Sequence, residues 1–291
     1  MTRQNKHLKL LTAMILAVAV SACSNSVDER PTPDEQADGK NVPFRIAEDE
    51  FMGGTVPVDA QNRPVKTFTL TVTEQEQEIT EGVRVITWAF GLEGQEASVP
   101  GPELRVNEGD LVRITLKNTH HQPHTIHLHG MTSLSQEMDG VPTTSLRVYP
   151  GEEYTYEFVA EEPGLILYHC HEQTYQHMDY GMYGLLIVEP KERYVEYDRE
   201  FNLILDEWDS RQDPAHEQHH PDPNYTLMNG KAFPDTEPID LPEGEVGLIR
   251  LVNAGYQNHP MHLHGMSFYV VSKDGYPLPE PYKADTLNVA P

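Results

Sequence analysis

One stretch of the chain occurs twice, about 135 residues apart, and each copy ends in the same histidine phrase. The first copy, Glu108 to Gly130, reads EGDLVRITLKNTHHQPHTIHLHG, and the second, Glu243 to Gly265, reads EGEVGLIRLVNAGYQNHPMHLHG. Both copies alternate apolar and polar residues, which is the pattern of a strand with one buried face. A repeat of this length predicts two copies of one β-sandwich, and therefore an all-β fold.

Further alternating runs divide the 291 residues into two such units. KTFTLTVTEQ, RVITWAF, YTYEFVA, LILYHCH and YGLLIVEP belong to the first unit, whereas EFNLILDEWD and MSFYVVSKDG belong to the second. Turn signals such as PGEE and EEPG separate the runs. We predict a first domain over residues 44–190 and a second domain over residues 191–291.

The N-terminal residues have the composition of an export signal. Arg3, Lys6 and Lys9 precede a short apolar run over residues 10–20, and the phrase VSAC ends at Cys23. This phrase resembles the lipobox of bacterial lipoproteins, which implies a signal peptide over residues 1–22 and a lipid on Cys23. An ordinary secretory signal is the alternative. A membrane span needs about 20 apolar residues, so this run is too short for one.

The next residues and the overall charge extend this interpretation. Residues 23–43 are polar, acidic and proline-containing, which predicts a disordered tether between the lipid and the folded body. We therefore expect an exported protein, lipid-anchored to a bacterial membrane and facing the periplasm or the cell exterior. A formal net charge of −25 argues against nucleic acid as a partner.

The cysteines indicate a metal site rather than a disulfide. The chain has two, Cys23 and Cys170, so a lipid on Cys23 leaves Cys170 without a partner. Because Cys170 stands between two histidines in an exported protein, we interpret it as a metal ligand.

Strand geometry sorts the motif residues into two sets, because side chains two positions apart share a face of the strand. One face collects four imidazoles, and the opposite face collects a thiolate and an imidazole. His177 and Met182 can add a second imidazole and a thioether to the thiolate set, which then matches a blue-copper centre. Imidazoles alone suit copper, zinc or iron. The imidazole set is His127, His129, His169 and His171, and the thiolate set begins with His124 and Cys170.

These motifs, together with GPELRVNEGD, MDGVP and NGKAFPDTEPI, resemble those of the multicopper oxidases, the laccase-like family built from cupredoxin domains. The resemblance covers the chain from about Phe44 to Pro291. It implies two cupredoxin-like Greek-key sandwiches and a copper-dependent oxidase. Such an enzyme takes single electrons from a phenol, an aromatic amine or a metal ion at a type 1 copper. It reduces O2 to water at a trinuclear type 2/type 3 cluster, so an intact protomer would hold about four copper ions.

The resemblance also gives each motif residue a role. Cys170, His169 and His171 are the catalytic candidates, because Cys170 would bind type 1 copper while its two neighbours reach the cluster. Type 1 copper would be held by His124, Cys170, His177 and Met182. Type 2 copper would be held by His127 and His262, and the type 3 pair by His129, His169, His171 and His264.

Two features depart from the commonest family pattern. The type 1 His and Met usually follow the Cys by five and ten residues, whereas His177 and Met182 follow Cys170 by seven and twelve. A two-residue insertion in EQTYQ accounts for this spacing, and Met178 is the rival axial ligand. The position of the Cys in the first domain is similar to that in the two-domain members of the family. Those members are homotrimers that share each cluster between neighbouring chains. We therefore expect a homotrimer whose partners are O2 and a small reducing substrate.

Two other functions remain open. A two-domain copper nitrite reductase shares the pair of domains and the blue copper. The motif of that family is similar to HCA where this chain has HCH, and it has an Asp where this chain has His127. A non-catalytic blue-copper electron carrier, also a lipoprotein, would hold type 1 copper with an empty cluster.

Several further residues have open roles. His259 is either a relic of a second type 1 site or a group behind the ligands, and a type 1 copper in domain 2 stays open. Asp139 belongs to a turn or lies near the substrate or the proton path. His120 and His121 cap a loop or compete with His124, and Trp88 and Trp208 are core residues. The loop containing His216, His219 and His220 is a solvated insertion or binds a labile metal ion.

A last expectation concerns the end of the chain. The two H-x-H pairs of the first domain are 40 residues apart, from His129 to His169, and the same interval after His264 passes Pro291. The second sandwich would then be incomplete, two type 3 imidazoles would be missing, and the sequence would be a C-terminally truncated piece. Expressed alone, such a piece is expected to load type 1 copper but not to reduce O2 at a useful rate.

Overall fold

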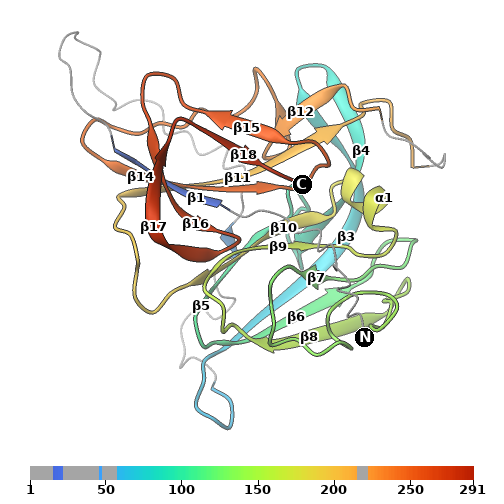
Figure 1. Ribbon diagram of the computed structural model, residues 1–291. Coiled ribbons are helices and arrows are strands. Elements are labelled where there is room, and N and C mark those ends of the chain that lie inside the picture. Colours follow the sequence, from blue (N-terminus) through green and yellow to red (C-terminus); the bar gives the residue numbers. More distant parts are fainter. Residues whose placement is uncertain (1–15, 22–45, 48–57, 215–221) are drawn as a thin grey trace, which may run out of the picture.

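The chain folds into two β-sandwiches that pack against each other (Figure 1). The computed structural model describes residues 16–21, 46–47, 58–214 and 222–291. Strands make up almost all of the regular structure in these ranges, and the short helix α1 (Thr174–Asp179) follows the central histidine motif. The predicted all-β fold is therefore confirmed.

The first sandwich consists of a four-stranded and a five-stranded sheet. The strand order is β4–β3–β6–β8 in the four-stranded sheet and β2–β5–β10–β9–β7 in the five-stranded sheet. These strands are β2 (Ile46–Ala47), β3 (Val65–Thr80), β4 (Val83–Leu92), β5 (Glu103–Asn107), β6 (Leu111–Lys117), β7 (His127–Leu128), β8 (Glu153–Val159), β9 (Gly164–His169) and β10 (Tyr183–Glu189).

Strands β3 and β6 illustrate why the alternating runs form this sandwich. They pair in parallel, with Phe68 opposite Ile114 and Leu70 opposite Leu116. All four side chains are buried in the core of the first sandwich. Because every second side chain of each strand points inward, one apolar face per sheet is enough to build this core.

The second sandwich consists of a seven-stranded sheet and a two-stranded ladder. The strand order is β13–β12–β11–β14–β1–β16–β17 in the large sheet, and β15 pairs with β18. These strands are β1 (Leu16–Ser21), β11 (Arg199–Trp208), β12 (Tyr225–Met228), β13 (Lys231–Ala232), β14 (Val246–Asn253), β15 (His259–His262), β16 (Phe268–Lys273), β17 (Tyr276–Ala284) and β18 (Thr286–Val289).

Strand β1 comes from the predicted signal peptide. It lies between β14 and β16 in antiparallel register, with Leu16 opposite Leu251 and Lys273. Residues 1–15 and 22 of the predicted signal peptide, Cys23 and the rest of the tether over residues 23–43 lie outside the described ranges. The signal peptide and the lipid on Cys23 therefore stay predictions.

Side chains along β9 divide between two cores. Ile166, Tyr168 and, just beyond the strand, Cys170 belong to the core of the first sandwich. Leu165 and Leu167 face the other way, into a core between the two sandwiches. Both faces of β9 are therefore covered by apolar groups, which explains why LILY lacks the polar positions of an ordinary half-exposed strand.

The core between the sandwiches joins the two domains. Tyr183 and Leu185 of β10 pack there with Trp208 of β11 and Val252 of β14, and all four side chains are buried. Burial of this apolar surface on both sides fixes the first sandwich against the second.

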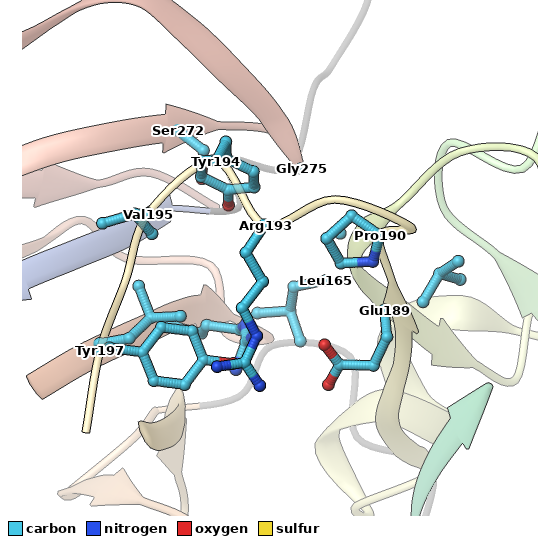
Figure 2. A pocket seen from close by; sticks show the side chains of 13 residues that line it. Leu165, Glu189, Pro190, Arg193, Tyr194, Val195, Tyr197, Ser272 and Gly275 are labelled. Carbon is cyan, nitrogen blue, oxygen red and sulfur yellow. The ribbon is translucent and has the colours of Figure 1, made fainter. Parts of the chain in front are cut away.

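The segment 190–198 connects β10 to β11 and lines a small hollow beside this core (Figure 2). The guanidinium of Arg193 lies 4.6 Å from the ring centroid of Tyr197 within the segment. Glu200 of β11 pairs with Arg105 of β5 and, at 2.7 Å, with Arg250 of β14, so charged groups also link the domains. The boundary predicted at residue 191 falls in this connecting segment.

No helix in the described ranges is long and apolar enough to cross a membrane.

We expect Leu167→Ala to destabilise the protein by about 2–5 kcal/mol, because it opens a cavity in the core between the sandwiches. Urea unfolding measures this loss. The matched control is Leu146→Ala, since the side chain of Leu146 is 66% exposed and its removal should change stability by less than about 0.5 kcal/mol. Equal losses in the two variants would contradict the assigned packing.

Candidate metal centre

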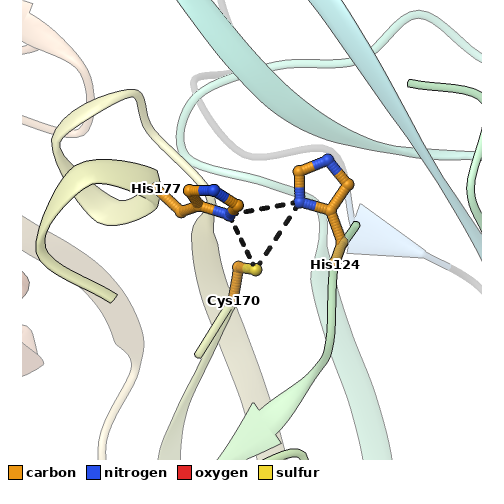
Figure 3. Close-up of side chains that lie close together, drawn as sticks. All are labelled: His124, Cys170 and His177. Atoms are coloured by element: carbon orange, nitrogen blue, oxygen red, sulfur yellow. Dashed lines mark hydrogen bonds between the residues drawn. The ribbon is translucent and has the colours of Figure 1, made fainter. Parts of the chain in front are cut away.

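Three separate segments bring two imidazoles and a thiol together (Figure 3). His124 lies in the loop before β7, where its backbone N–H and C=O both pair with Val148. Cys170 directly follows β9, and its N–H donates to the carbonyl of Met182. His177 lies on α1. The backbone of each of the three residues is thus held by regular hydrogen bonds.

The three donor atoms form a small triangle. Sγ of Cys170 is 3.1 Å from Nδ1 of His177 and 3.6 Å from Nδ1 of His124, and these two nitrogens are 3.2 Å apart. All three side chains are buried. Metal–ligand bonds of about 2.0–2.3 Å to nitrogen and sulfur span separations of this size. The triangle therefore fits one metal ion.

Burial keeps the three groups uncharged. Burial, together with neighbouring imidazoles, lowers the pKa of His124 to about 2 and that of His177 to about 3. It raises the pKa of the Cys170 thiol to about 12. Neutral imidazoles are ready to bind a metal, and a metal ion stabilises the thiolate form of a buried thiol. A bound cation would balance the negative charge of this thiolate.

The structure separates the two candidate methionines. Met182 is fully buried in the core of the first sandwich, as Cys170 is, whereas Met178 packs against the core between the domains. The stretch EQTYQ, which carries the extra residues, leads into α1 through Gln173 at a φ of 40° and forms the first turn of that helix. The helix returns His177 to Cys170, so the longer spacing and the triangle are compatible.

The second set of imidazoles gathers on the other face of β9. His127 of β7 lies directly opposite His169 in the antiparallel ladder. Nε2 of His129 is 2.8 Å from Nε2 of His169, and the ring of His171 lies 5.2 Å from that of His127. Burial keeps the pKa of His169 well below its usual value and lowers that of His129 to about 4. This group of imidazoles can also hold metal ions.

Hydrogen bonds orient these rings from behind. Nδ1–H of His127 donates to the carbonyl oxygen of Asp139 at 2.6 Å, and Nδ1–H of His169 donates to that of Cys170 at 2.8 Å. In each ring the proton on Nδ1 leaves the lone pair on Nε2. Asp139 is thus a support for His127, and the turn that carries it approaches β7 closely. A Cβ at Gly140 would lie 2.0 Å from the carbonyl oxygen of Ile126.

The second domain repeats this support at the surface. Nδ1–H of His262 donates to the carbonyl oxygen of Asp285 at 2.7 Å, and the ring of His264 lies 4.9 Å from that of His262. Both side chains are exposed. Among the described residues, His127, His129 and His169 group as a possible metal site without this pair. The structure therefore does not bring the two predicted halves of a cluster together within one chain.

His259 has a carboxylate partner instead of a metal group. Its Nε2 contacts the carboxylate of Glu207, which is buried and also accepts backbone N–H groups from Tyr256 and Gln257. In the repeat, His259 stands where His124 stands in the first domain. The carboxylate lies on the Nε2 side of His259, which is the side on which His120 contacts His124 in the first domain.

Sequence reasoning missed part of the surroundings of His124. The side chain of Asn118 accepts the backbone N–H of His120, and Nδ1 of His120 accepts the backbone N–H of Gln122 in the same loop. The side chain of His120 also contacts His124, and Glu74 of β3 lies beyond it. Trp88 is buried, as predicted, and its ring also packs on His120. No sequence signal identifies Glu74, which is one of many exposed acidic residues. His216, His219 and His220 lie outside the described ranges.

Comparison with known proteins gives the same family for both domains. Models described as multicopper oxidase match residues 71–193 and 209–291. The chain is 30% identical over 197 residues to multicopper oxidase MmcO of Mycobacterium tuberculosis. The matched region covers 65% of this chain and 38% of that protein. It is 34% identical over 134 residues to the copper-containing nitrite reductase of Neisseria meningitidis, covering 45% and 32% respectively. The chain spans about a third of the length of these two relatives.

Solved structures extend this similarity to the fold. The multicopper oxidase mgLAC has a TM-score of 0.72 and 36% identity, covering 78% of this chain and 73% of that chain. The blue copper oxidase from Nitrosomonas europaea has a TM-score of 0.72 and 35% identity over the same shares. The expected metal is therefore confirmed as copper, which the observed His and Cys donors suit. Two family models that together match most of the chain, and a shared fold, show that the chain belongs to the multicopper oxidase family.

Proposed function

We propose that the whole protein is an oxidase that passes single electrons from a small reducing substrate to O2. The donor would be a phenol, an aromatic amine or a metal ion. One observation carries the proposal: the thiol of Cys170 faces one candidate copper site, while its covalent neighbours His169 and His171 face another. When bound, copper supplies one-electron redox chemistry.

The residues of this chain would hold the two sites and connect them. Type 1 copper would be held by His124, Cys170, His177 and Met182, in a pocket from which the apolar core excludes water. Nδ1–H of His169 donates to the carbonyl oxygen of Cys170, so a hydrogen bond joins the two sites in addition to the peptide bond. Type 2 copper is assigned to His127 and His262, and the type 3 pair to His129, His169, His171 and His264.

We also propose that the functional form is a homotrimer. His262 and His264 are exposed, with His262 already oriented by Asp285, and they do not join the imidazoles of the first domain in one chain. A pair of oriented, exposed imidazoles is suited to complete a site on a neighbouring protomer. In this arrangement the second domain of one chain would supply ligands to the first domain of the next.

Export and lipid attachment form the third part of the proposal. The basic and apolar N-terminal residues and VSAC support a signal peptide over residues 1–22 and a lipid on Cys23. The protein would then lie on a bacterial membrane, facing the periplasm or the cell exterior.

A copper nitrite reductase is the second candidate, and the relative from Neisseria meningitidis supports it. Four imidazoles around β7 and β9 favour the oxidase, because His127 and His171 stand where the reductase pattern has other residues. An electron carrier would need only the buried triangle. The copper content and the oxidant that the reduced protein accepts distinguish the three functions.

For the whole protein, we expect about four copper ions per protomer and a strong visible thiolate-to-copper absorption. After anaerobic reduction, O2 should restore this absorption rapidly and nitrite should not. Metal analysis and stopped-flow absorption measure these two properties. Rapid recovery with nitrite and about two copper ions per protomer would identify the reductase instead.

The matched variant for this experiment is Cys170→Ser. It removes the only thiol among the described residues and should abolish the visible absorption and any oxidation of a phenolic donor. The imidazoles on the other face of β9 should still bind copper, which electron paramagnetic resonance detects. An intense blue colour in copper-loaded Cys170→Ser would contradict the assignment of Cys170 as a type 1 copper ligand.

Met182→Leu should keep the blue colour and raise the reduction potential of the type 1 copper, because a weak axial donor that stabilises the oxidised copper is lost. Redox titration of the visible absorption measures the change. Met178→Leu is the control, since this side chain packs in the other core, and it should leave the potential unchanged. The reverse pattern would make Met178 the axial ligand.

Cys23→Ser should release the exported protein from the membrane, because the proposed lipid would have no attachment point. Fractionation of the producing cells into soluble and membrane parts measures this release. A Ser24→Ala variant controls for a general effect of substitution near the cleavage position. Unchanged membrane association of Cys23→Ser would count against the lipid anchor.

A further inference from the structure

The Nε2 atom of His124 faces a second imidazole rather than solvent. Nε2 of His124 is 2.9 Å from Nδ1 of His120. The side chain of His120 is only 3% exposed, and among the described residues its Nε2 has no hydrogen-bond partner. Oε2 of Glu74 lies 3.8 Å from this Nε2. His124, His120 and Glu74 therefore form a row that leads from the buried triangle to the surface.

The position of each proton in this row follows from the proposed type 1 site. If Nδ1 of His124 binds copper, its proton lies on Nε2, and this N–H donates to Nδ1 of His120. The backbone N–H of Gln122 also points at Nδ1 of His120, at 3.4 Å, which supports Nδ1 as an acceptor. The proton of neutral His120 then lies on Nε2, on the side of the Glu74 carboxylate.

Glu74 is fixed at the outer end of the row. Its Oε2 accepts a hydrogen bond from Nε1–H of Trp88 at 3.1 Å, and Trp88 lies opposite Glu74 in the ladder of β3 and β4. The ring of Trp88 packs on His120, with centroids 4.7 Å apart. The carboxylate is thus held near the imidazole that it faces, although its side chain is 47% exposed.

The second domain provides an internal comparison for His120. Asn118 and Asn253 organise the same turn in the two domains, each accepting the backbone N–H two residues later at 2.9 Å. That residue is His120 in the first domain and Gly255 in the second. The turn therefore forms without a histidine. In the first domain His120 contacts Nε2 of His124. In the second domain Glu207 contacts Nε2 of His259 directly, and a Cβ at Gly255 would lie 2.4 Å from its carboxylate oxygen.

We propose that His120 is a positioning residue for the type 1 copper ligand His124, and that Glu74 acts through His120 to favour the oxidised copper. The inference rests on the proposed type 1 site. As a hydrogen-bond acceptor, His120 fixes the tautomer and the ring orientation of His124. The negative charge of Glu74 makes His120 a stronger acceptor, which increases electron density on His124 and stabilises Cu2+ over Cu+.

The same three-residue neighbourhood is less suited to a separate cation. Glu74, His120 and His121 lie close enough to hold one, but a metal ion on His120 would need the lone pair of Nε2. The two donors that point at Nδ1 assign a proton to Nε2 instead. We therefore interpret the row as a support for the candidate copper site.

The test is the reduction potential of the copper-loaded protein, measured by redox titration of its visible absorption. Glu74→Gln keeps an acceptor for Trp88 and removes the charge. It should favour Cu+ over Cu2+ by up to about tenfold, which corresponds to about 59 mV for one electron. The matched control is Glu76→Gln, which removes an equal charge two residues further along the same face of β3. It should give less than a third of that shift.

A double-mutant cycle then tests whether Glu74 acts through His120. His120→Asn places an oxygen near the position of Nδ1, so it should keep the hydrogen bond from His124 and the blue spectrum. It lacks the group that faces Glu74, so adding Glu74→Gln to this variant should not raise the potential further. His120→Leu removes the acceptor and should broaden the copper spectrum, whereas His120→Asn should retain its shape.

Failure of this inference and failure of the type 1 assignment give different results. A wild-type protein that loads copper without an intense visible absorption overturns the type 1 assignment. A blue protein in which Glu74→Gln and Glu76→Gln shift the potential equally overturns the role of Glu74, since only general surface charge then acts. A potential that shifts on addition of Zn2+ in the wild type, but not in Glu74→Gln, shows a cation site and also overturns the proposal.

Discussion

Adjacent residues of an extended strand must face opposite ways, and the chemistry of this protein depends on that constraint at the end of β9. Cys170 faces one group of donors, while His169 and His171 face another. A register shift of one residue would exchange the two faces and mix the thiol with the imidazoles. The ladders of β9 with β7 and β10 fix this register, with His169 opposite His127 and Tyr183. Strand pairing thus determines which side chains can share a metal ion.

Burial has a second effect, which is electrostatic. Burial disfavours charge in the triangle around Cys170 and around His169, and it lowers the pKa values of His124, His177 and His169. Carboxylates lie at the edges of these regions. Glu74 lies outside His120 on one side, and the carboxylate of Asp139 lies 3.3 Å from Nδ1 of His127 on the other. The protein therefore places neutral donors inside and carboxylates behind them, an order that leaves the positive charge to the metal.

The sequence predicts features that depend on local periodicity. Alternation alone indicates the two sandwiches, the two faces of YHCH and the pairing of His124 with Cys170, and the structure has all three. It does not predict α1, because a six-residue helix after a strand leaves no clear periodic pattern. The sequence also does not predict the contact between Glu74 and His120, since this contact depends on the long-range pairing of β3 with β4 and β6. The partner of His259 is hidden for the same reason, because Glu207 lies 52 residues earlier on β11.

The contact between Glu207 and His259 also marks a difference between the two domains. In the first domain the loop before β7, Cys170 and α1 meet at a site whose missing charge a copper ion supplies. In the second domain the corresponding loop is already fastened to β11 by a carboxylate and an imidazole from the chain itself. In the second domain, therefore, no metal ion is needed to join this loop to β11.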